Sequence, residues 1–445
     1  MTDGSTQEKP AEVPRGAKQS GETRGRWSFV EASVWTERML AALERGVKGG
    51  RWFSLVDKVY APDNLRSSFE HVRKNKGSAG VDHQTLEMFG DRLEENLESL
   101  SCQLSDGSYR PQAIRRVEIP KPGSRERRPL GIPTVRDRVA QAALRNVLEP
   151  IFERDFAEHS YGFRPGRGCK DALRRVEKLL NGGFMHVVDA DLKRFFDTIP
   201  HERIMEGVSA KVSDGRVLSL IEGYLTQKVM DGLSEWTPEE GTPQGAVLSP
   251  LLANISLDPL DHRMAKAGFE MVRYADDFVI LCRTREEASQ ALAAVRAWTA
   301  QAGLTLHPDK TRLVDAASGE SFEFLGYRFE RGRKWPRKKS LMKLKDVIRE
   351  RTKRTSGKSL DTIIKAVNPI LRGWFAYFKH SYKTTFPSVD SWLRVRLRSI
   401  LRKRRGGRGR GRGSDHQRWP NAFFEEHGLY SLVAAHAQAC QSLRR

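Results

Sequence analysis

Cysteine is scarce in this chain, and its placement excludes two kinds of site. Only four cysteines occur among 445 residues, all far apart, and none forms a CxxC pair or a Cys/His cluster. Structural zinc and a disulfide framework both need such grouped residues. Long apolar runs are also missing, since no stretch approaches the roughly 18 residues that a membrane-spanning helix requires. Residues 1–26 contain no apolar signal core, so we expect a cytoplasmic protein without membrane association.

Acidic residues are almost missing from one long segment. Residues 331–414 hold 27 lysines and arginines but only 4 acids, a net charge of +23, whereas the whole chain carries +21. A single basic run is often only a solvated surface. A segment that holds the whole positive excess indicates instead a polyanionic partner, bound through its phosphates and released by salt.

Aromatic residues lie between the cations of this segment. Leu371, Trp374, Phe375 and Phe378 follow the spacing of an amphipathic helix and are expected mainly in its core. The basic side chains around them are the candidates for nucleic-acid contacts. These candidates are Arg372, Lys379, Arg394, Arg398 and Arg402. The run at 402–414 has six glycines or serines and no apolar side chain, which is typical of a flexible basic linker.

The remaining chain divides by sequence pattern. Residues 1–26 have almost no apolar content and are expected to be disordered, and residues 27–108 carry apolar side chains at helical spacing. Over 109–330 short strand-like and helical stretches alternate, which predicts an α/β or α+β catalytic domain. Beyond about residue 331 we expect helices without strands, with one or two short helices over 415–445.

Two apolar strand-like stretches contain acids, which are costly there unless they are paired or bound to a metal. In the first, strand alternation places Asp189 and Asp191 on one face, while Asp197 is more simply explained as a turn or helix cap. In the second, Asp276 and Asp277 are adjacent between apolar runs. This second pattern predicts a hairpin with two acids at its tip.

Adjacent carboxylates repel each other, so a cation is their natural partner. Magnesium prefers carboxylate oxygens and keeps the rest of its shell for water and phosphate. Three carboxylates can hold two such ions, one for an attacking hydroxyl and one for a leaving oxygen, as phosphoryl transfer requires.

Several motifs together resemble one known family. YADD at 274–277 resembles the metal-binding motif of reverse transcriptases. Further blocks resemble group II intron-encoded reverse transcriptases and occur in the same order, from about residue 53 to at least residue 400. They are RRPLGIPTVRDRVAQ (127–141), HSYGFRPGRGCKDAL (159–173), DADLKRFFDTIPH (189–201), GTPQGAVLSPLLANISLDPLD (241–261), FEFLGYRF (322–329) and NPILRGWFAYFKH (368–380).

The resemblance implies an α+β fold, the right-hand polymerase, with further segments around it. Its parts in chain order would be a disordered tail (1–26), a helical N-terminal extension (27–108), fingers and palm (109–330), a helical thumb and maturase domain (331–401), a basic Arg/Gly linker (402–414) and a nucleic-acid-binding tail (415–445).

The resemblance also implies the metal ligands. Asp191, Asp276 and Asp277 would bind two Mg²⁺ ions, and Asp191 fits better than Asp189 because LKRFF follows it, as in the family.

The residues that the resemblance places at the incoming dNTP are Lys121, Arg128, Phe195 or Phe196, Gln244 and Lys310. The two basic fingers residues would grip the triphosphate, and one phenylalanine of the pair would exclude a 2'-hydroxyl by its bulk. Spacing does not decide which phenylalanine does so, and Lys310 could equally be a solvated turn lysine. Independently, Gly241 and Gly245 beside Gln244 would let the backbone approach a ligand closely.

The function implied is RNA-directed DNA polymerisation during retrohoming in a bacterial cytosol, together with maturase binding of the intron RNA to assist splicing. The partners would be group II intron RNA, template RNA with a DNA primer, target DNA and dNTPs. The paired cysteines and histidines of the endonuclease found in many relatives are missing, so we expect priming from nascent DNA or other free 3' ends.

Three other functions compete with this one. A splicing-only maturase would not need the intact YADD motif and Asp191. A domesticated reverse transcriptase in phage defence or CRISPR adaptation would not need the NPILRGWFAYF block. An RNA-dependent RNA polymerase is disfavoured by Phe195 and Phe196.

Overall fold

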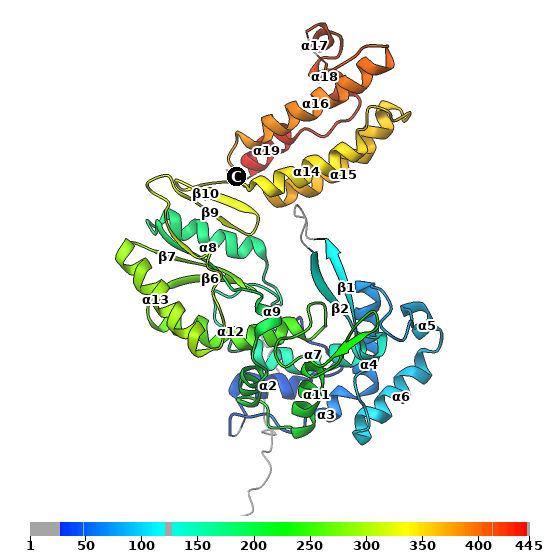
Figure 1. Ribbon diagram of the computed structural model, residues 1–445, viewed down its shortest axis with the longest axis vertical. Helices are drawn as coiled ribbons and strands as arrows, with labels where there is room; N and C mark the ends of the chain where they lie inside the picture. Colours follow the sequence, from blue (N-terminus) through cyan, green and yellow to red (C-terminus); the bar gives the residue numbers. More distant parts are fainter. Residues whose placement is uncertain (1–26, 48, 121–126, 412, 443–445) are drawn as a thin grey trace, which may run out of the picture. The chain divides into compact units, whose positions relative to one another are not determined.

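A computed structural model describes residues 27–47, 49–120, 127–411 and 413–442, which form two compact units (Figure 1). The first unit comprises the described residues from 27 to 313 apart from 185–187. The second comprises 185–187 and the described residues from 314 onward. Both units mix helices with strands, which confirms the α+β expectation.

The described part of the first unit begins with five helices. They are α2 (Glu37–Arg45), α3 (Val56–Val59), α4 (Pro62–Asn75), α5 (Leu86–Asp91) and α6 (Leu93–Asp106). Of these, α3 to α6 pack on one long buried helix, α7 (Val135–Glu153). Local chemistry sets the starts, because Thr36 and Thr85 cap α2 and α5 and Pro62 opens α4. The apolar pattern from residue 86 to 104 predicts one helix, but the structure breaks it at Arg92.

A four-stranded sheet follows, in the order β2-β1-β4-β5. Its strands are β1 (Ile114–Pro120), β2 (Arg127–Ile132), β4 (Val229–Asp231) and β5 (Ser234–Trp236). Strands β1 and β2 are antiparallel, whereas β4 joins β1 in parallel and turns back as a short hairpin into β5.

A second four-stranded sheet, the central sheet, has the order β6-β7-β3-β8. Its strands are β3 (His186–Asp191), β6 (Glu270–Tyr274), β7 (Asp277–Cys282) and β8 (Arg312–Asp315). Helices α8 (Cys169–Asn181), α12 (Ser249–Lys266) and α13 (Arg285–Gln301) pack against β6 and β7. Three shorter helices complete the unit, α9 (Phe195–Thr198), α10 (His201–Ser209) and α11 (Gly215–Leu225).

The second unit joins a small antiparallel sheet to a helical bundle. The strands are β9 (Ser321–Phe324), β10 (Tyr327–Glu330) and β11 (Arg333–Pro336), and the helices are α14 (Lys338–Arg351), α15 (Leu360–Phe378), α16 (Thr385–Arg404), α17 (Ser414–Arg418), α18 (Asn421–Glu426) and α19 (Leu432–Ser442). Strand structure therefore continues past residue 331, and residues 415–442 form three helices instead of one or two.

The described part of the basic run at 402–414 is not a free linker. Its first residues belong to α16, and the chain then folds back, with Arg402 Nε donating to Arg408 O at 2.8 Å and Gly411 N to Ser399 Oγ at 3.3 Å. A Cβ at Gly411 would lie 2.7 Å from the Cβ of Arg398, so this close return depends on glycine.

In the part of the chain that the structure describes, no helix has both the length and the apolar character to cross a bilayer.

Asp214 joins the N-terminal segment to helix α11. Its carboxylate accepts hydrogen bonds from the amides of Leu55 (2.6 Å), Val56 (2.9 Å), Arg216 (3.0 Å) and Val217 (3.2 Å). Burial by itself would raise the pKa of Asp214, but the four amide donors outweigh burial and lower the pKa below its usual 3.8.

We expect Asp214→Asn to lower the free energy of unfolding at pH 7 by about 2 kcal/mol, because hydrogen bonds to a charged acceptor are lost. A depressed pKa stabilises the fold above the unfolded-state value, so the deficit should be complete above pH 4 and shrink as the pH falls through the lowered pKa. Thermal unfolding at pH 7 and pH 3 measures both effects. Asp91→Asn, at an exposed carboxylate, is the control, and a deficit independent of pH would contradict this account.

Candidate active site

The turn between β6 and β7 carries the two adjacent acids. Tyr274 pairs with Asp277 across the hairpin, so Ala275 and Asp276 form a two-residue turn. This confirms the hairpin with acids at its tip. Ala275 has φ +59°, a left-handed conformation that an alanine adopts only at a cost. Other contacts must therefore hold the turn in this shape.

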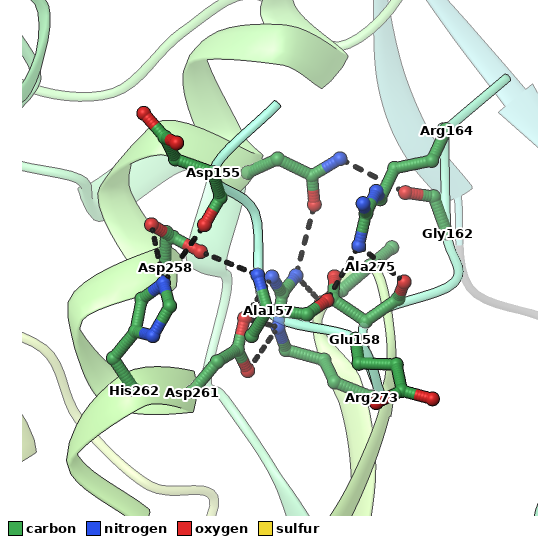
Figure 2. Close-up of polar contacts among 12 residues, drawn as sticks. Asp155, Ala157, Glu158, Gly162, Arg164, Asp258, Asp261, His262, Arg273 and Ala275 are labelled. Carbon is green, nitrogen blue, oxygen red and sulfur yellow. Dashed lines mark hydrogen bonds and ion pairs between the residues drawn. The ribbon is translucent and has the colours of Figure 1, made fainter. Parts of the chain in front are cut away.

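Arg273, just before the turn, supplies one such contact. Its side chain is 1% exposed and forms a two-pronged ion pair with Asp261 of α12, with Nε–O distances of 2.8 and 3.0 Å. The remaining nitrogen, Nη1, donates to Asn254 Oδ1 and to the carbonyl of Ala275, both at 2.9 Å. Figure 2 shows Arg273 joining the helix and the turn in this way. The acidic turn is thus fastened to α12 from inside the protein.

The loop before α8 lies against the same turn. Asn254 Nδ2 donates to Gly162 O at 2.9 Å, and Tyr161 N donates to Arg273 O at 2.9 Å. A Cβ on Gly162 would lie only 2.2 Å from Ala275 N, closer than any side chain permits. Glycine is therefore required at position 162 so that the loop can reach the turn (Figure 2).

Arg164 anchors the other end of this loop. Its guanidinium is buried, pairs with Glu153 at 2.8 Å and donates to the carbonyls of Ala157 (2.6 Å) and Ser160 (2.8 Å). Ala157 N in turn donates to Asp258 Oδ1 of α12 at 3.1 Å (Figure 2). The loop is therefore fixed to α7 and α12 as well as to the turn.

The third acid, Asp191, lies at the end of β3, next to β7. Burial raises the pKa of Asp276, and the negative charge of Asp191 raises it further, whereas Lys310 and Arg273 act in the opposite direction. Asp191 and Asp276 therefore lie close enough to repel each other. The ammonium group of Lys310 forms an ion pair with Asp191.

Asp189, two residues earlier on β3, also has a basic partner. Its carboxylate lies 3.1 Å from the guanidinium of Arg312, which follows Lys310 closely in the chain. Each carboxylate on this strand is thus matched by a cation from the segment that enters β8.

Within the described ranges, no three His, Cys, Asp or Glu side chains are arranged to hold a metal ion. The acids nevertheless suit a divalent cation chemically. They offer the oxygen ligands that Mg²⁺ prefers, and Asp191 and Asp276 repel each other, whereas the Lys310 ammonium group now partly neutralises Asp191.

A pocket lies between the first sheet and the segment that follows β3, and the three candidate acids are not among the residues that line it. Phe196, Gly241, Thr242, Pro243 and Gln244 line one part of it. The structure separates the two candidate phenylalanines, because Phe196 lines the pocket whereas Phe195 is 2% exposed and packs in the core.

Close backbone approaches shape this pocket, as the glycines of the GTPQG motif predict. Gly241 has φ +86°, and a Cβ there would lie 2.7 Å from the Asp197 backbone. Gly245 has φ +110°, and a Cβ there would lie 2.6 Å from Gly131 O. Gly131 N also donates to Gln244 O at 2.7 Å, which ties the motif to β2.

The structure describes only one of the two predicted triphosphate contacts of the fingers. Arg128 is an exposed residue of β2, opposite Ile119 of β1, and is not among the residues that line the pocket. Lys121 lies outside the described residues.

Sequence reasoning missed other pocket residues. Arg116 and Trp236 line the far side, with the guanidinium 5.6 Å from the indole centroid. Arg194 also lines it and pairs at 3.2 Å with Asp197, which lies in the first turn of α9 and does not cap it. The one sequence signal for Trp236 is a large aromatic residue beside the polar hairpin turn DGLSE.

The basic side chains predicted to bind phosphates in the second unit differ in how far they are exposed to a ligand. Arg372 is exposed beside the Tyr430 ring, with its guanidinium 5.3 Å from the ring centroid, and Lys379 is half-buried. Arg398 is 3% exposed and donates to Trp419 O and Asn421 Oδ1. The placement of Arg398 on a phosphate-binding face is therefore wrong, because its donors are used inside the fold.

Arg394 and Arg402 are partly neutralised by nearby acids. Arg394 lies 3.8 Å from Asp390 and 3.4 Å from Glu425, and Arg402 lies 2.6 Å from Asp415.

Sequence reasoning also missed a cationic cluster around the half-buried Trp392. Lys345, Arg349 and Arg396 all lie between 5.4 and 5.7 Å from its ring centroid. Three cations at one indole favour a polyanion or a stacked base beside them.

Two known protein families match parts of the chain. The family described as reverse transcriptase (RNA-dependent DNA polymerase) matches residues 119–329, and the group II intron, maturase-specific domain matches residues 341–419.

Individual proteins agree with these matches. Group II intron-encoded protein LtrA of Lactococcus lactis subsp. cremoris is 36% identical over 232 residues, which cover 50% of this chain and 38% of that protein. The chain thus spans only a part of that relative. Protein YkfC of Escherichia coli (strain K12) is 31% identical over 346 residues, which cover 69% of this chain and 86% of that protein.

Among solved structures, a chain of a partial Cas6-RT-Cas1–Cas2 complex matches at 26% identity. The match covers 57% of this chain and 43% of that chain, with a TM-score of 0.36.

We expect Gly162→Ala to lower the free energy of unfolding by about 1–3 kcal/mol, because the added methyl group forces the loop and the acidic turn apart. Chemical denaturation of the variant and the wild type measures this. Gly215→Ala is the matched control, since a Cβ at Gly215 meets nothing within 4 Å. Equal stability of the two variants would show that the loop does not rest on the turn.

Proposed function

We propose that this chain, which belongs to the group II intron-encoded reverse transcriptases, extends a DNA primer with dNTPs on an RNA template during retrohoming. The observation that carries the proposal is the placement of Asp276 in the turn before β7 and of Asp191 at the end of the neighbouring strand β3, where the charge of Asp191 raises the pKa of Asp276. Acids that repel one another provide the oxygen ligands that metal-assisted phosphoryl transfer requires, and the pocket after β3, lined by Phe196 and Gln244, would hold the nucleotide.

Asp191, Asp276 and Asp277 would hold two Mg²⁺ ions. These ions would supply activation of the primer 3'-hydroxyl and neutralisation of the phosphate charge. The contribution of the chain itself is to fix the carboxylates before substrate arrives. Arg273 does so by holding the carbonyl of Ala275, the residue directly before Asp276.

The pocket would select the sugar and position the base. The bulk of Phe196 would exclude a 2'-hydroxyl, and Phe195 would support it from the core, since the two ring centroids lie 5.6 Å apart at 70°. Gln244 would contact substrate or template, because it lines the pocket, and the bond from Gly131 to its carbonyl holds its backbone against β2.

Three cations would bind the triphosphate. Lys310 is exposed and already pairs with Asp191, so it lies where incoming phosphates would meet the acids. Arg128 would approach from β2 of the first sheet, and the sequence resemblance assigns the third cation to Lys121.

The second unit would bind the intron RNA as a maturase and contribute to contacts with target DNA. Its charge supports this, since residues 331–414 carry +23. We assign phosphate contacts to Arg372 and Lys379, with weaker contributions from Arg394 and Arg402, and leave Arg398 out.

Primer extension on an RNA template tests the polymerase. With Asp276→Ala we expect the rate to fall by roughly 1,000-fold, because a bound metal contributes several kcal/mol and about 1.4 kcal/mol is a factor of 10. Asp189→Asn is the matched control on the same sheet and should lose far less. Intron RNA binding should survive in both variants. Equal rates for Asp276→Ala and the wild type would refute the assignment of this acid.

Salt dependence tests the RNA-binding surface. Each phosphate contact that is removed should reduce the slope of log K against log salt by about 0.7–0.9. We therefore expect Arg372→Gln and Lys379→Gln each to weaken intron RNA binding and to flatten this slope by about one contact. Lys266→Gln, an exposed lysine of the first unit, provides the comparison. Filter binding between 50 and 200 mM salt, roughly the range in which such contacts weaken, gives the slopes. Unchanged slopes in both variants would show that Arg372 and Lys379 do not contact the phosphates of the RNA.

A further inference from the structure

One exposed residue near the pocket has an unusual backbone. In the loop before α8, Tyr161, Gly162 and Arg164 are buried, whereas Phe163 between them is 48% exposed with φ +57°. A left-handed conformation is uncommon for a bulky residue, because its Cβ crowds the backbone.

The neighbours of Phe163 impose this conformation. Gly162 O is held by Asn254, Gly162 itself abuts Ala275, and Arg164 is fixed by three hydrogen-bond partners. The chain between these anchors must bulge outward, and glycine or asparagine would adopt the bulge more easily. Burial of a half-exposed ring adds little stability and does not offset the cost of this backbone conformation. A phenylalanine at this position therefore needs another explanation.

The contact of the ring supplies that reason. The centroid of Phe163 lies 6.4 Å from that of Phe196, with the planes at 83°, an edge-to-face arrangement. Phe195 makes a second edge-to-face contact with Phe196 at 5.6 Å. Phe196 is therefore held between a core ring and an exposed ring. The residues that line the described pocket include Phe196 but not Phe163.

We propose that Phe163 is a positioning residue that holds the Phe196 ring in place and thereby sets the discrimination between deoxyribonucleotides and ribonucleotides. This inference rests on the proposed polymerase function. Phe195 is buried and cannot yield, so without Phe163 the Phe196 ring gains freedom on its exposed side. Space for a 2'-hydroxyl then opens at the sugar.

The same loop also touches the acidic turn through Gly162. One short segment thus contacts two parts of the site and fixes their relative position. These are the turn that carries Asp276 and the Phe196 ring that would contact the sugar. Phe163 can be changed without touching the turn, because its side chain points to Phe196 and its neighbours make the backbone contacts.

The test is single-nucleotide incorporation on an RNA template, with kcat and KM measured for a dNTP and the matching rNTP. For Phe163→Ala and Phe163→Gly we expect the selectivity in kcat/KM to fall by roughly 10-fold, the scale of one lost apolar contact. The fall should come from a lower KM for the rNTP, with kcat for the dNTP changing far less. Phe163→Tyr, which keeps the ring, should retain wild-type selectivity.

Two controls separate this role from a loss of structure. Glycine suits a positive φ, so Phe163→Gly should melt no lower than the wild type. Phe53→Ala removes another phenylalanine of similar exposure, 44%, and should leave selectivity unchanged.

Unchanged selectivity in active Phe163→Ala and Phe163→Gly variants would overturn this inference alone. Weaker primer–template binding at unchanged selectivity would also overturn it, since the ring would then contact nucleic acid directly. Failure of the wild type to extend the primer would overturn the polymerase function together with it.

Discussion

The ion pair between Arg273 and Asp261 is the interaction on which the arrangement of the site depends. A buried arginine is costly unless its charge is paired and its donors are used, and removing one partner of a buried pair typically costs about 3–5 kcal/mol. Asp261, Asn254 and the carbonyl of Ala275 together meet this need. The carbonyl of Ala275 belongs to the turn itself. The hydrogen bond that satisfies Arg273 therefore also holds the backbone that carries Asp276 and Asp277.

The constraint extends outward through the loop before α8. Asn254 holds both Arg273 and Gly162, so one amide side chain connects the helix, the turn and the loop. Because Gly162 has no side chain, the loop can contact the turn. The next residue, Phe163, contacts the Phe196 ring, which lines the pocket. In a preorganised site of this kind, substrate binding energy is not spent on ordering the side chains. Rigidity of this kind favours catalysis for that reason.

The second unit combines a hydrophobic helical core with a large positive charge. Part of that charge is used internally, since Arg398 fastens α16 to the segment around Trp419, and Arg402 and Arg394 face acids. The net charge of the sequence therefore overstates what is available to a ligand. The cations around Trp392 are also partly used inside the unit, since Arg396 donates to Thr352 and Arg349 pairs with Asp346, but their gathering at one ring still favours an anionic partner.

The sequence by itself determined the features that depend on local pattern. Apolar periodicity indicated helices and the β6–β7 hairpin, and the GTPQG glycines predicted close backbone approaches. Acids within apolar strands drew attention to Asp189, Asp191, Asp276 and Asp277, and the family resemblance favoured Asp191 over Asp189. Only the tertiary structure showed that Phe196 lines the pocket while Phe195 and Arg398 are buried, and that Asn254 joins Gly162 to Arg273. Those outcomes depend on which neighbour packs on each face of a residue. Such neighbours come from distant parts of the chain, so no local spacing encodes them.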